Sequence, residues 1–516
     1  MSNLLLPLPA GNADGQINVD LASIGRTNKI YSEEEGAYIR NVLLAARQRK
    51  EELVDLIGRC EVALAPHKKL PPDVLRSIFP FSNETRAEFP LSKRIVALRL
   101  LHIIHVCSAW RQLALETPAL WSNLGIYLTF VNRSRHHQAL SSATQWFARA
   151  QDMPRSLFIR LDWLDDNEPY LRDVWEQILK FMALYRLRHL QLQYPIDRLT
   201  LKLPEHACSS IERLHLIGNE GIRRRAKSLF SHFGTLSNLK RLEICNTSNL
   251  RGLNNVIRWH QLRSLNIRAS EHGEITPSLC LNALRQCQLL EHCSLSLSKE
   301  SLFVYTVASG EEKIVLANMD QLHLKFFDGS AASAFLQPLV IPKITTFTLG
   351  TVSLEGPWTR LNCDMPTLID IIQRSAGMRQ IYCLDIDTSP LLDIGILLEL
   401  LPSLERIYIE SGYLTDNVIE QLSRGKLGPR LCSIYSGHVH DTADEILSMV
   451  ESRYQKATNG GQIESGFCPF KSISIPCTTV DNERTNYYRC RVEFLSDECN
   501  ADVWLAIGAD EDSEED

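Results

Sequence analysis

The chain has 516 residues, too many for one compact core, so we expect two or more domains or an elongated repeat array. Its composition, 44% hydrophobic and 22% charged, excludes wholesale disorder. The formal net charge is −6, and much of it lies in the acidic stretch from Asp510 to Asp516. The rest of the chain is close to neutral, so its charge gives no reason to expect nucleic acid or an anionic membrane as a partner.

The fourteen cysteines are sparse for this length, and no two have C-x-x-C spacing, which argues against a disulfide framework. The N-terminal segment has no basic region and is interrupted by Pro7 and Pro9, unlike a signal peptide. No uncharged apolar stretch approaches the roughly eighteen residues of a transmembrane helix. We therefore expect a soluble protein of the cytoplasm or the nucleus.

Two segments are predicted at the N-terminus. Residues 1–30 are rich in Gly, Asn, Asp and Pro without periodicity, which predicts a disordered tail. Residues 31–65 predict one long amphipathic helix, with Ser32 as its cap, an acidic first turn and an end before Pro66. The apolar spacing breaks around RQRKEE, too soon for sustained heptads, so packing against the next module is favoured over a coiled-coil dimer.

A helical module is predicted over residues 66–120. Pro71 and Pro72 suit the first turn of a short helix, whose apolar face would be Val74, Leu75, Ile78 and Phe79. A polar loop follows, and a longer helix from about Ser92 must stop near Pro118. Spacing of i, i+3, i+4, i+7 and i+10 places five residues on one stripe of that helix: Ile103, Val106, Cys107, Trp110 and Leu113.

Beyond this module the chain repeats itself. Nine copies of the pattern L-x-x-L-x-L start at Leu187, Ile211, Leu239, Leu262, Leu290, Met319, Ile344, Leu404 and Leu431. Weaker copies start at Trp121, Pro154, Met378 and Phe470. With the copy at Met378, nine steps cover the 244 residues from Leu187 to Leu431, about 27 residues each, which is typical of leucine-rich repeats.

Each repeat offers one strand and one helical pattern, cannot bury its own apolar residues and must stack on its neighbours. The predicted fold class is therefore α/β: a helical module followed by a leucine-rich-repeat horseshoe over residues 121–508, with a parallel sheet on its concave face, and an acidic tail over 509–516. The asparagine expected after the last apolar position matches only at Asn219. We therefore expect irregular curvature and non-standard units, particularly across the step from Ile344 to Met378.

The helical module resembles a known family. The segment from Leu70 to Trp121 contains LPPDVLRSIF and then HVCSAWRQLALETPALW, and it resembles the F-box of fungal F-box proteins, in which leucine-rich repeats follow. The leading LP, the I-F, the V-C-x-x-W and the closing P-x-L-W all match in order. Asp73 stands where the family usually has Glu, and the stretch between Phe79 and Val106 is longer than in the compact F-box.

The resemblance implies a function in which the F-box binds a Skp-family adaptor, and through it the cullin of an SCF-type ubiquitin ligase, while the repeats hold a substrate protein. The chain itself would be no enzyme and need no cofactor or metal. The alternative is a leucine-rich-repeat scaffold that recruits no ligase. Carried over by position, the adaptor face or its support consists of Leu70, Pro71, Val74, Leu75, Ile78, Val106, Cys107 and Trp110; the alternative is that these residues form only the module's own core.

Other candidate chemistry is weak. His105 lies two residues from Cys107, so their side chains diverge on a helix, and His102 with His105 lacks further metal ligands. No phosphate-binding loop and no hydrolase or metalloprotease motif is present. The repeat phase favours packing thiols over a zinc site for a group of three cysteines: Cys280, Cys287 and Cys293.

Two short segments leave alternatives open. The basic cluster at residues 221–230 is either a nuclear signal or, as we favour, a solvated helix face. Ser513, which precedes three acidic residues, is either a phosphorylation site or part of an unmodified solubilising tail.

In the repeat pattern, residues that flank the inner apolar positions point out of the concave sheet. Arg, His and Lys outnumber acidic residues there, so we predict that this face binds the substrate and that residues 187–325 favour an acidic or phosphorylated partner. A generic polar surface is the alternative. The predicted residues are His189, Gln191, Arg213, His215, Arg241, Glu243, Asn266, Arg268, His292, His323, Lys325, Arg406, Tyr408 and Glu410.

Overall fold

The chain divides into two compact units, Met1–Phe81 and Ser82–Asp516, so the first unit ends inside the predicted helical module. None of the described helices is both long and apolar enough to cross a membrane. The computed structural model describes residues 26, 29–64, 70–82, 87–89, 103–129, 136–162, 169–193, 205–218, 233, 235–245, 253–268, 276–297, 313–327, 332–351, 363–375, 380–387, 391–437, 443–459, 467–476, 482–499 and 501–504.

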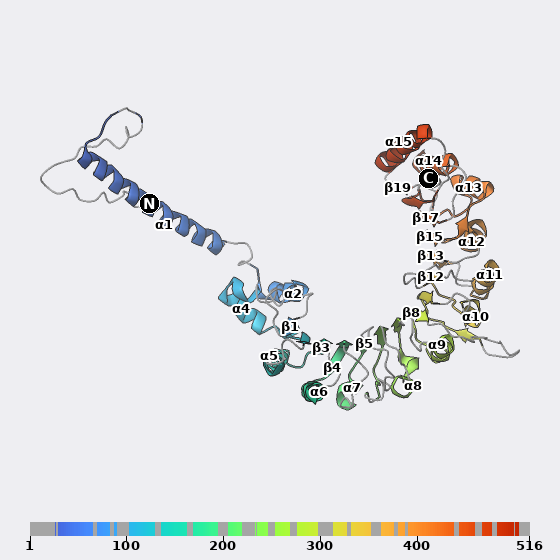
Figure 1. Cartoon of the computed structure of the whole chain (residues 1–516), viewed down its shortest axis with the longest axis horizontal. Coiled ribbons are helices and arrows are strands. Elements are labelled where there is room, and N and C mark those ends of the chain that lie inside the picture. The colour runs from blue at the N-terminus through green and yellow to red at the C-terminus, as the bar shows by residue number, and fades with distance from the viewer. Residues whose placement is uncertain are drawn as a thin grey trace, which may run out of the picture. The chain divides into compact units, whose positions relative to one another are not determined.

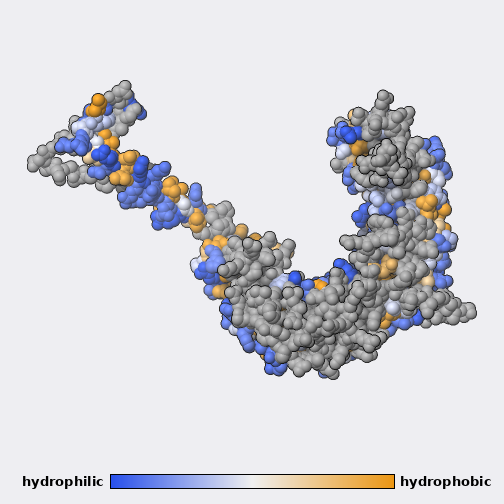
Figure 2. Space-filling view, viewed as in Figure 1, coloured by the Kyte–Doolittle hydropathy of each residue, from blue (hydrophilic) through white to orange (hydrophobic). Residues whose placement is uncertain are grey.

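The first unit contains helices α1 (Glu33–Leu64) and α2 (Pro72–Ser82). The predicted cap of α1 is confirmed: the Ser32 hydroxyl accepts from the Glu35 N–H at 3.2 Å, and the Glu35 carboxylate accepts from the Ser32 N–H at 2.9 Å. No residue of α1 is buried, and hydrophobic residues alternate with hydrophilic ones along it (Figure 2). The packing of α1 on the next module stays a prediction.

In the second unit, fifteen strands of the described chain form one sheet in sequence order, with every neighbouring pair parallel (Figure 1). The copy predicted at Met378 is three residues out of phase, because Cys383 pairs with Thr346 and Arg406, so the pattern that supplies the strand Cys383–Ile386 starts at Ile381. The other twelve predicted copies each supply one strand, and β1 and β19 add one at each edge. Their bounds are β1 (Ala87–Phe89), β2 (Asn123–Thr129), β3 (Arg155–Asp162), β4 (Leu187–Gln193), β5 (Arg213–Ile217), β6 (Arg241–Cys245), β7 (Ser264–Arg268), β8 (His292–Leu297), β10 (Gln321–Phe326), β12 (Thr346–Thr351), β13 (Cys383–Ile386), β15 (Arg406–Ile409), β17 (Ser433–Ser436), β18 (Ser472–Ser474) and β19 (Asp502–Trp504).

The helices of this unit lie on the opposite side of the sheet from its open surface (Figure 1). Parallel strands are about 4.8 Å apart whereas a helix is about 10 Å wide, so stacking the two layers curves the sheet with its strands on the inner side. Two short pairs add to this layer: β9 (Ile314–Val315) with β11 (Leu339–Val340), and β14 (Leu392–Asp393) with β16 (Gly412–Tyr413). The helices are α4 (Ser108–Leu115), η2 (Pro118–Trp121), α5 (His136–Arg149), α6 (Pro169–Ala183), α7 (Glu205–Ser209), α8 (Leu253–Val256), η6 (Trp259–Gln261), α9 (Pro277–Leu284), α10 (Ala332–Leu336), α11 (Met365–Arg374), α12 (Ile394–Leu400), α13 (Asp416–Ser423), α14 (Ala443–Asn459) and α15 (Asn482–Cys499).

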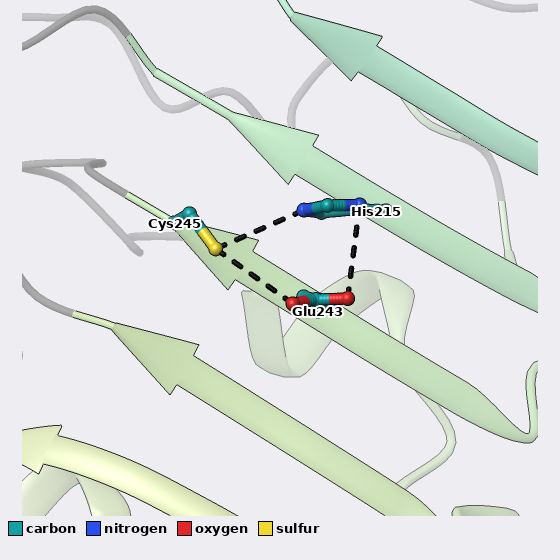
Figure 3. A group of neighbouring side chains, drawn as sticks. All are labelled: His215, Glu243 and Cys245. Atoms are coloured by element: carbon teal, nitrogen blue, oxygen red, sulfur yellow. Dashed lines mark hydrogen bonds and ion pairs between the residues drawn. The ribbon is translucent and has the colours of Figure 1, made fainter. Parts of the chain in front are cut away.

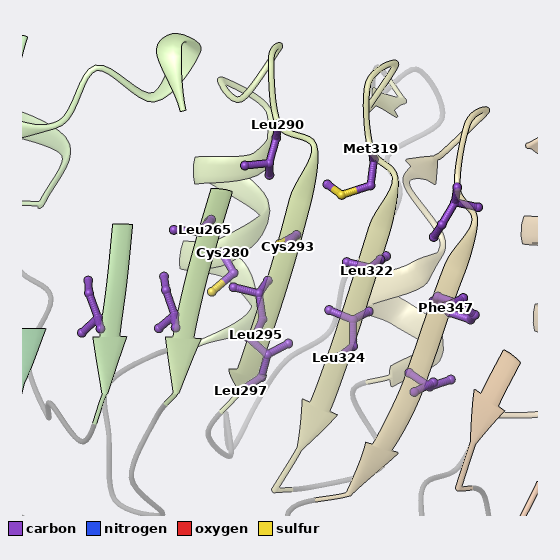
Figure 4. Close-up of a cluster of buried hydrophobic side chains, with 14 of the residues drawn as sticks. Leu265, Cys280, Leu290, Cys293, Leu295, Leu297, Met319, Leu322, Leu324 and Phe347 are labelled. Atoms are coloured by element: carbon purple, nitrogen blue, oxygen red, sulfur yellow. The ribbon is translucent and has the colours of Figure 1, made fainter. Parts of the chain in front are cut away.

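The core lies between the sheet and the helices. The apolar strand positions are buried and stack in ladders on their neighbours, as Leu265, Cys293 and Leu322 do (Figure 4). The predicted packing role of the three cysteines is confirmed, because Cys280, Cys287 and Cys293 are all buried in this core. Burial raises the pKa of the Cys287 thiol to about 12, so the thiol is neutral at physiological pH.

The structure corrects the single long helix predicted to end near Pro118. Residues 103–106 are helical, but Cys107 is extended, with φ −161° and ψ 171°, and caps α4 by accepting from the Trp110 N–H at 3.5 Å. Cys107 therefore does not continue one helical stripe. The polar loop predicted before it contains β1, which pairs with β2 in parallel, so the stretch that lengthens the F-box-like segment supplies the edge strand of the repeat sheet.

The step after Ile344 is long, as expected, because the copy that supplies β13 starts at Ile381, 37 residues later. Strand β12 pairs in register with β13, and α11 lies between them in sequence. The short helices occur earlier, because α7 has five residues and α8 has four. Other predictions lie outside the described residues: those for residues 1–25, 92–102, 221–230 and 509–516, for Asn219 and for the start of the copy at Met378.

Candidate functional site: the open face of the sheet

We use the term open face for the surface of the fifteen-stranded sheet that lies opposite the core. Strand residues alternate between buried and solvent-accessible, as in β5, where Leu214 and Leu216 are buried and Arg213 and His215 are not. All fourteen residues predicted to point out of the sheet are half-buried or exposed, and those within the strands occupy the open-face positions. Their role in binding stays a prediction.

A basic pair lies on the N-terminal half of the open face. Arg213 and Arg241 are register partners on adjacent strands, and both are exposed. Within the part of the chain that the structure describes, neither guanidinium forms an ion pair. By contrast, Lys240, which directly precedes Arg241, forms an ion pair with Glu212 at 3.3 Å. The Arg213–Arg241 pair is therefore suited to a carboxylate or phosphate of a partner.

The C-terminal half of the open face carries tyrosines and carboxylates. The rings of Tyr408 and Tyr435 stack with centroids 3.8 Å apart and an interplanar angle of 3°, and both hydroxyls donate to the Glu410 carboxylate, at 3.2 and 3.1 Å. Burial, together with Tyr435 and Glu410, raises the pKa of Tyr408. Burial also raises the pKa of Asp385, the register partner of Tyr408, although Lys325 opposes the shift. This half is therefore aromatic and acidic, unlike the first.

Tyr435 was missed by the sequence prediction, although the signal was present. It occupies the position in the copy at Leu431 that Tyr408 occupies in the copy at Leu404, and the two are register partners. Reading the last copy with the same template would have found it.

A second missed residue joins two predicted ones. His215 on β5 and Glu243 on β6 are register partners, and Cys245 lies two residues beyond Glu243 on the same face (Figure 3). The Cys245 Sγ lies 3.7 Å from His215 Nε2 and 3.9 Å from Glu243 Oε1, and His215 Nδ1 lies 3.7 Å from Glu243 Oε2. Burial and the Glu243 carboxylate raise the pKa of the Cys245 thiol to about 11. The prediction missed Cys245, although it included Arg268, Lys325 and Glu410 from the same position of their copies.

Near the first strands, the open face is hollowed. A pocket there is lined by the predicted residues His189 and Gln191, together with Asn123, Ser156 and Phe158 from β2 and β3. The last three were not predicted because their strands carry the weaker copies of the repeat.

The predicted adaptor residues fall into two groups, one in each unit. On α2 and just before it, Leu70, Val74 and Ile78 are exposed, whereas Leu75 is buried and can only support the surface. Pro71 is also exposed. In the second unit, Val106 is exposed while Cys107 and Trp110 are half-buried.

No protein-family model matches the chain, and no curated protein matches it. Among solved structures it is similar to an internalin of Listeria monocytogenes, with 14% identity and a TM-score of 0.30 over 60% of this chain and 80% of that one. It is also similar to a leucine-rich-repeat protein of Leptospira interrogans, with 11% identity and a TM-score of 0.33 over 76% of this chain and 97% of that one. Both TM-scores are too low to assign the fold. The leucine-rich-repeat class therefore rests on the period of this chain and on its parallel strand ladder.

Proposed function

We propose that this chain is a non-catalytic substrate-recognition subunit of an SCF-type cullin–RING ubiquitin ligase. The F-box-like segment binds a Skp-family adaptor, and the open face of the leucine-rich-repeat sheet binds the substrate protein. The order of F-box-like motifs before the repeats supports the first half of this proposal. The parallel sheet with one solvent-accessible face supports the second, since such a surface is what repeat proteins use for extended partners.

The observation that carries the proposal is the exposed apolar row of the first unit, which we define as Leu70, Val74, Ile78 and Phe81. These side chains are 38%, 41%, 43% and 78% exposed, at spacings of four, four and three residues that place them along one side of α2. The buried residues of the same helix, Leu75 and Phe79, lie at other positions. A short helix with apolar residues beyond those it buries is suited to bind a partner protein.

The open face supports a partner with negative charge on its N-terminal half. Arg213 and Arg241 present two adjacent guanidinium groups, each able to bind a carboxylate or a phosphate in bidentate fashion. An acidic or phosphorylated segment of the substrate protein therefore fits this half. The stacked Tyr408 and Tyr435 offer a rigid aromatic contact on the other half.

The test is binding of the purified full-length chain to a purified Skp-family adaptor. Replacing Val74 and Ile78 together by Asp should weaken binding by about 100-fold or more, because two apolar anchors become buried, unpaired charges. Ser77→Asp is the control, since it adds one of the two carboxylates at an exposed polar position of the same helix, and it should leave binding within about threefold.

Circular dichroism and thermal unfolding of each variant establish that the repeats stay folded. If the double variant binds as tightly as Ser77→Asp, the exposed apolar row is not the adaptor-binding surface. If the wild-type chain does not bind the adaptor, the ligase role is excluded. The chain would then be a leucine-rich-repeat scaffold that recruits no ligase.

A further inference from the structure

We propose that His215, Glu243 and Cys245 on the open face form a binding site for a divalent metal ion of the zinc class. Each residue offers one ligand atom, and these atoms all lie within 4.8 Å of one another (Figure 3). Imidazole nitrogen, thiolate sulfur and carboxylate oxygen are the three ligand types that zinc takes in proteins. Within the described part of the chain, this is the group of three that meets that spacing.

The spacing is close to that of a shared metal site. With zinc bonds of about 2.0–2.3 Å, the ligand atoms of a tetrahedral site lie about 3.4–3.6 Å apart. One ligand atom from each of the three residues lies within 4.8 Å of the other two, and the Cys245 Sγ and His215 Nε2 are 3.7 Å apart. Without an ion, the Cys245 thiol contacts His215 Nε2 and Glu243 Oε1 directly, and the other imidazole nitrogen lies 3.7 Å from Glu243 Oε2. Rotation of the His215 and Glu243 side chains is therefore needed to bring one atom of each to ligand spacing around an ion.

The backbone holds the three ligands in place before any ion binds. His215 and Glu243 face each other across a parallel strand pair, and Glu243 and Cys245 share a face because they are two residues apart on one strand. The Asn266 amide on the next strand donates to Glu243 Oε1 at 2.9 Å, which leaves Oε2 directed toward His215. Sites built on strands and oriented by a neighbouring hydrogen bond require little rearrangement on binding.

The charges also balance. On binding, the Cys245 thiol releases its proton to solvent, and the resulting thiolate and the Glu243 carboxylate together carry two negative charges, which neutralise a divalent ion. Arg268 lies 3.8 Å from Glu243, but its side chain is 61% exposed and can move into solvent when the ion binds. Three protein ligands leave a fourth position for water, as in zinc sites that exchange a ligand. The group lies on the proposed substrate-binding face, so a metal there would also be within reach of a side chain of the bound protein. This last point rests on the proposed function.

Cobalt(II) binding to the untagged, metal-free, full-length chain tests the site. The wild type should bind one equivalent with the absorption of tetrahedral cobalt and a thiolate-to-cobalt charge-transfer band, and zinc should displace it. Cys245→Ser should lose that band, and His215→Gln and Glu243→Gln should each weaken binding by at least about tenfold. Cys383→Ser is the matched control, because Cys383 is also a half-buried thiol on the open face, and its variant should keep the band and the affinity.

The proposal is overturned if the wild type shows no charge-transfer band, or if Cys245→Ser keeps the wild-type band. Equal loss in Cys383→Ser would also overturn it, since the thiol ligand would then lie elsewhere. Far-ultraviolet circular dichroism checks that each variant is folded. If the Cys245→Ser chain is unstable, the loss of cobalt affinity in Glu243→Gln tests the site instead. We expect adaptor binding to be unchanged in these variants, so failure of the metal site and failure of the proposed ligase role are distinguishable.

Discussion

Arg453→Met is expected to lower the free energy of unfolding of the C-terminal repeats by about 3–5 kcal/mol. The Arg453 side chain is fully buried in α14, and its guanidinium donates to five backbone carbonyls. The Phe467 and Phe470 rings lie 4.9 and 4.5 Å from it. Burial lowers its pKa to about 10, which still leaves it charged at neutral pH. The accepting carbonyls belong to Cys468, Leu422, Gly428, Pro429 and Leu431.

The cost is large because methionine fills much of the volume but donates no hydrogen bond, so each of the five carbonyls loses one donor. The Leu422, Gly428 and Pro429 carbonyls keep a backbone N–H donor. Urea unfolding measures the loss, and hydrogen exchange should show it in residues 416–476, since a repeat contacts only its neighbours. Lys456→Met, at an exposed position of the same helix, is the control and should change stability by less than about 0.5 kcal/mol. Equal unfolding midpoints for the two variants would show that the Arg453 network contributes nothing.

Trp121→Ala should cost about 3–5 kcal/mol at the other end of the array. Trp121 is buried in η2, and its indole N–H donates to the Ala114 carbonyl at 2.9 Å. Its ring packs edge-on against Trp146 at 4.6 Å, and the Arg149 guanidinium lies over it, also at 4.6 Å. The substitution leaves a large cavity and removes one hydrogen bond where α4 joins the first full strand, although the Ala114 carbonyl still accepts from the Thr117 N–H.

Hydrogen exchange should speed up in residues 108–161 of the Trp121→Ala chain and stay unchanged beyond β8, because coupling falls off along a repeat array. Leu115→Ala, at an exposed position of α4, is the control with little expected effect. A uniform change along the whole chain would contradict this prediction and indicate that the unit unfolds as one body.

The repeat array could be predicted because each copy carries its own evidence: apolar residues at fixed spacing that recur about every 27 residues. Strands β1 and β19 could not, since each has three residues and no copy of the pattern. The break at Cys107 was missed for a different reason. The apolar spacing of Ile103, Val106 and Trp110 fits an uninterrupted helix. Whether Cys107 continues that helix or caps α4 depends on its backbone conformation, which periodicity does not encode.

The composition of the open face could also be predicted, because alternation along a strand decides which side chains leave the core. Contacts between repeats depend on register, which one repeat alone does not give. The stacking of Tyr408 on Tyr435 therefore emerged from the structure, as did the meeting of His215 with Cys245. The position of Cys245 in its copy could have been read from the sequence, as it was for Arg268, but its contact with His215 could not.

The most direct test of the proposed function is to separate its two binding surfaces. Quantitative mass spectrometry identifies the proteins retained by the full-length chain from cells with the proteasome blocked, for wild type, for Val74→Asp with Ile78→Asp, and for Arg213→Glu with Arg241→Glu. We expect the first double variant to lose the Skp-family adaptor and cullin but keep the other partners. The second should keep the adaptor and lose an acidic or phosphorylated partner. Absence of the adaptor from the wild-type sample, or loss of the same proteins by both variants, would contradict the proposal.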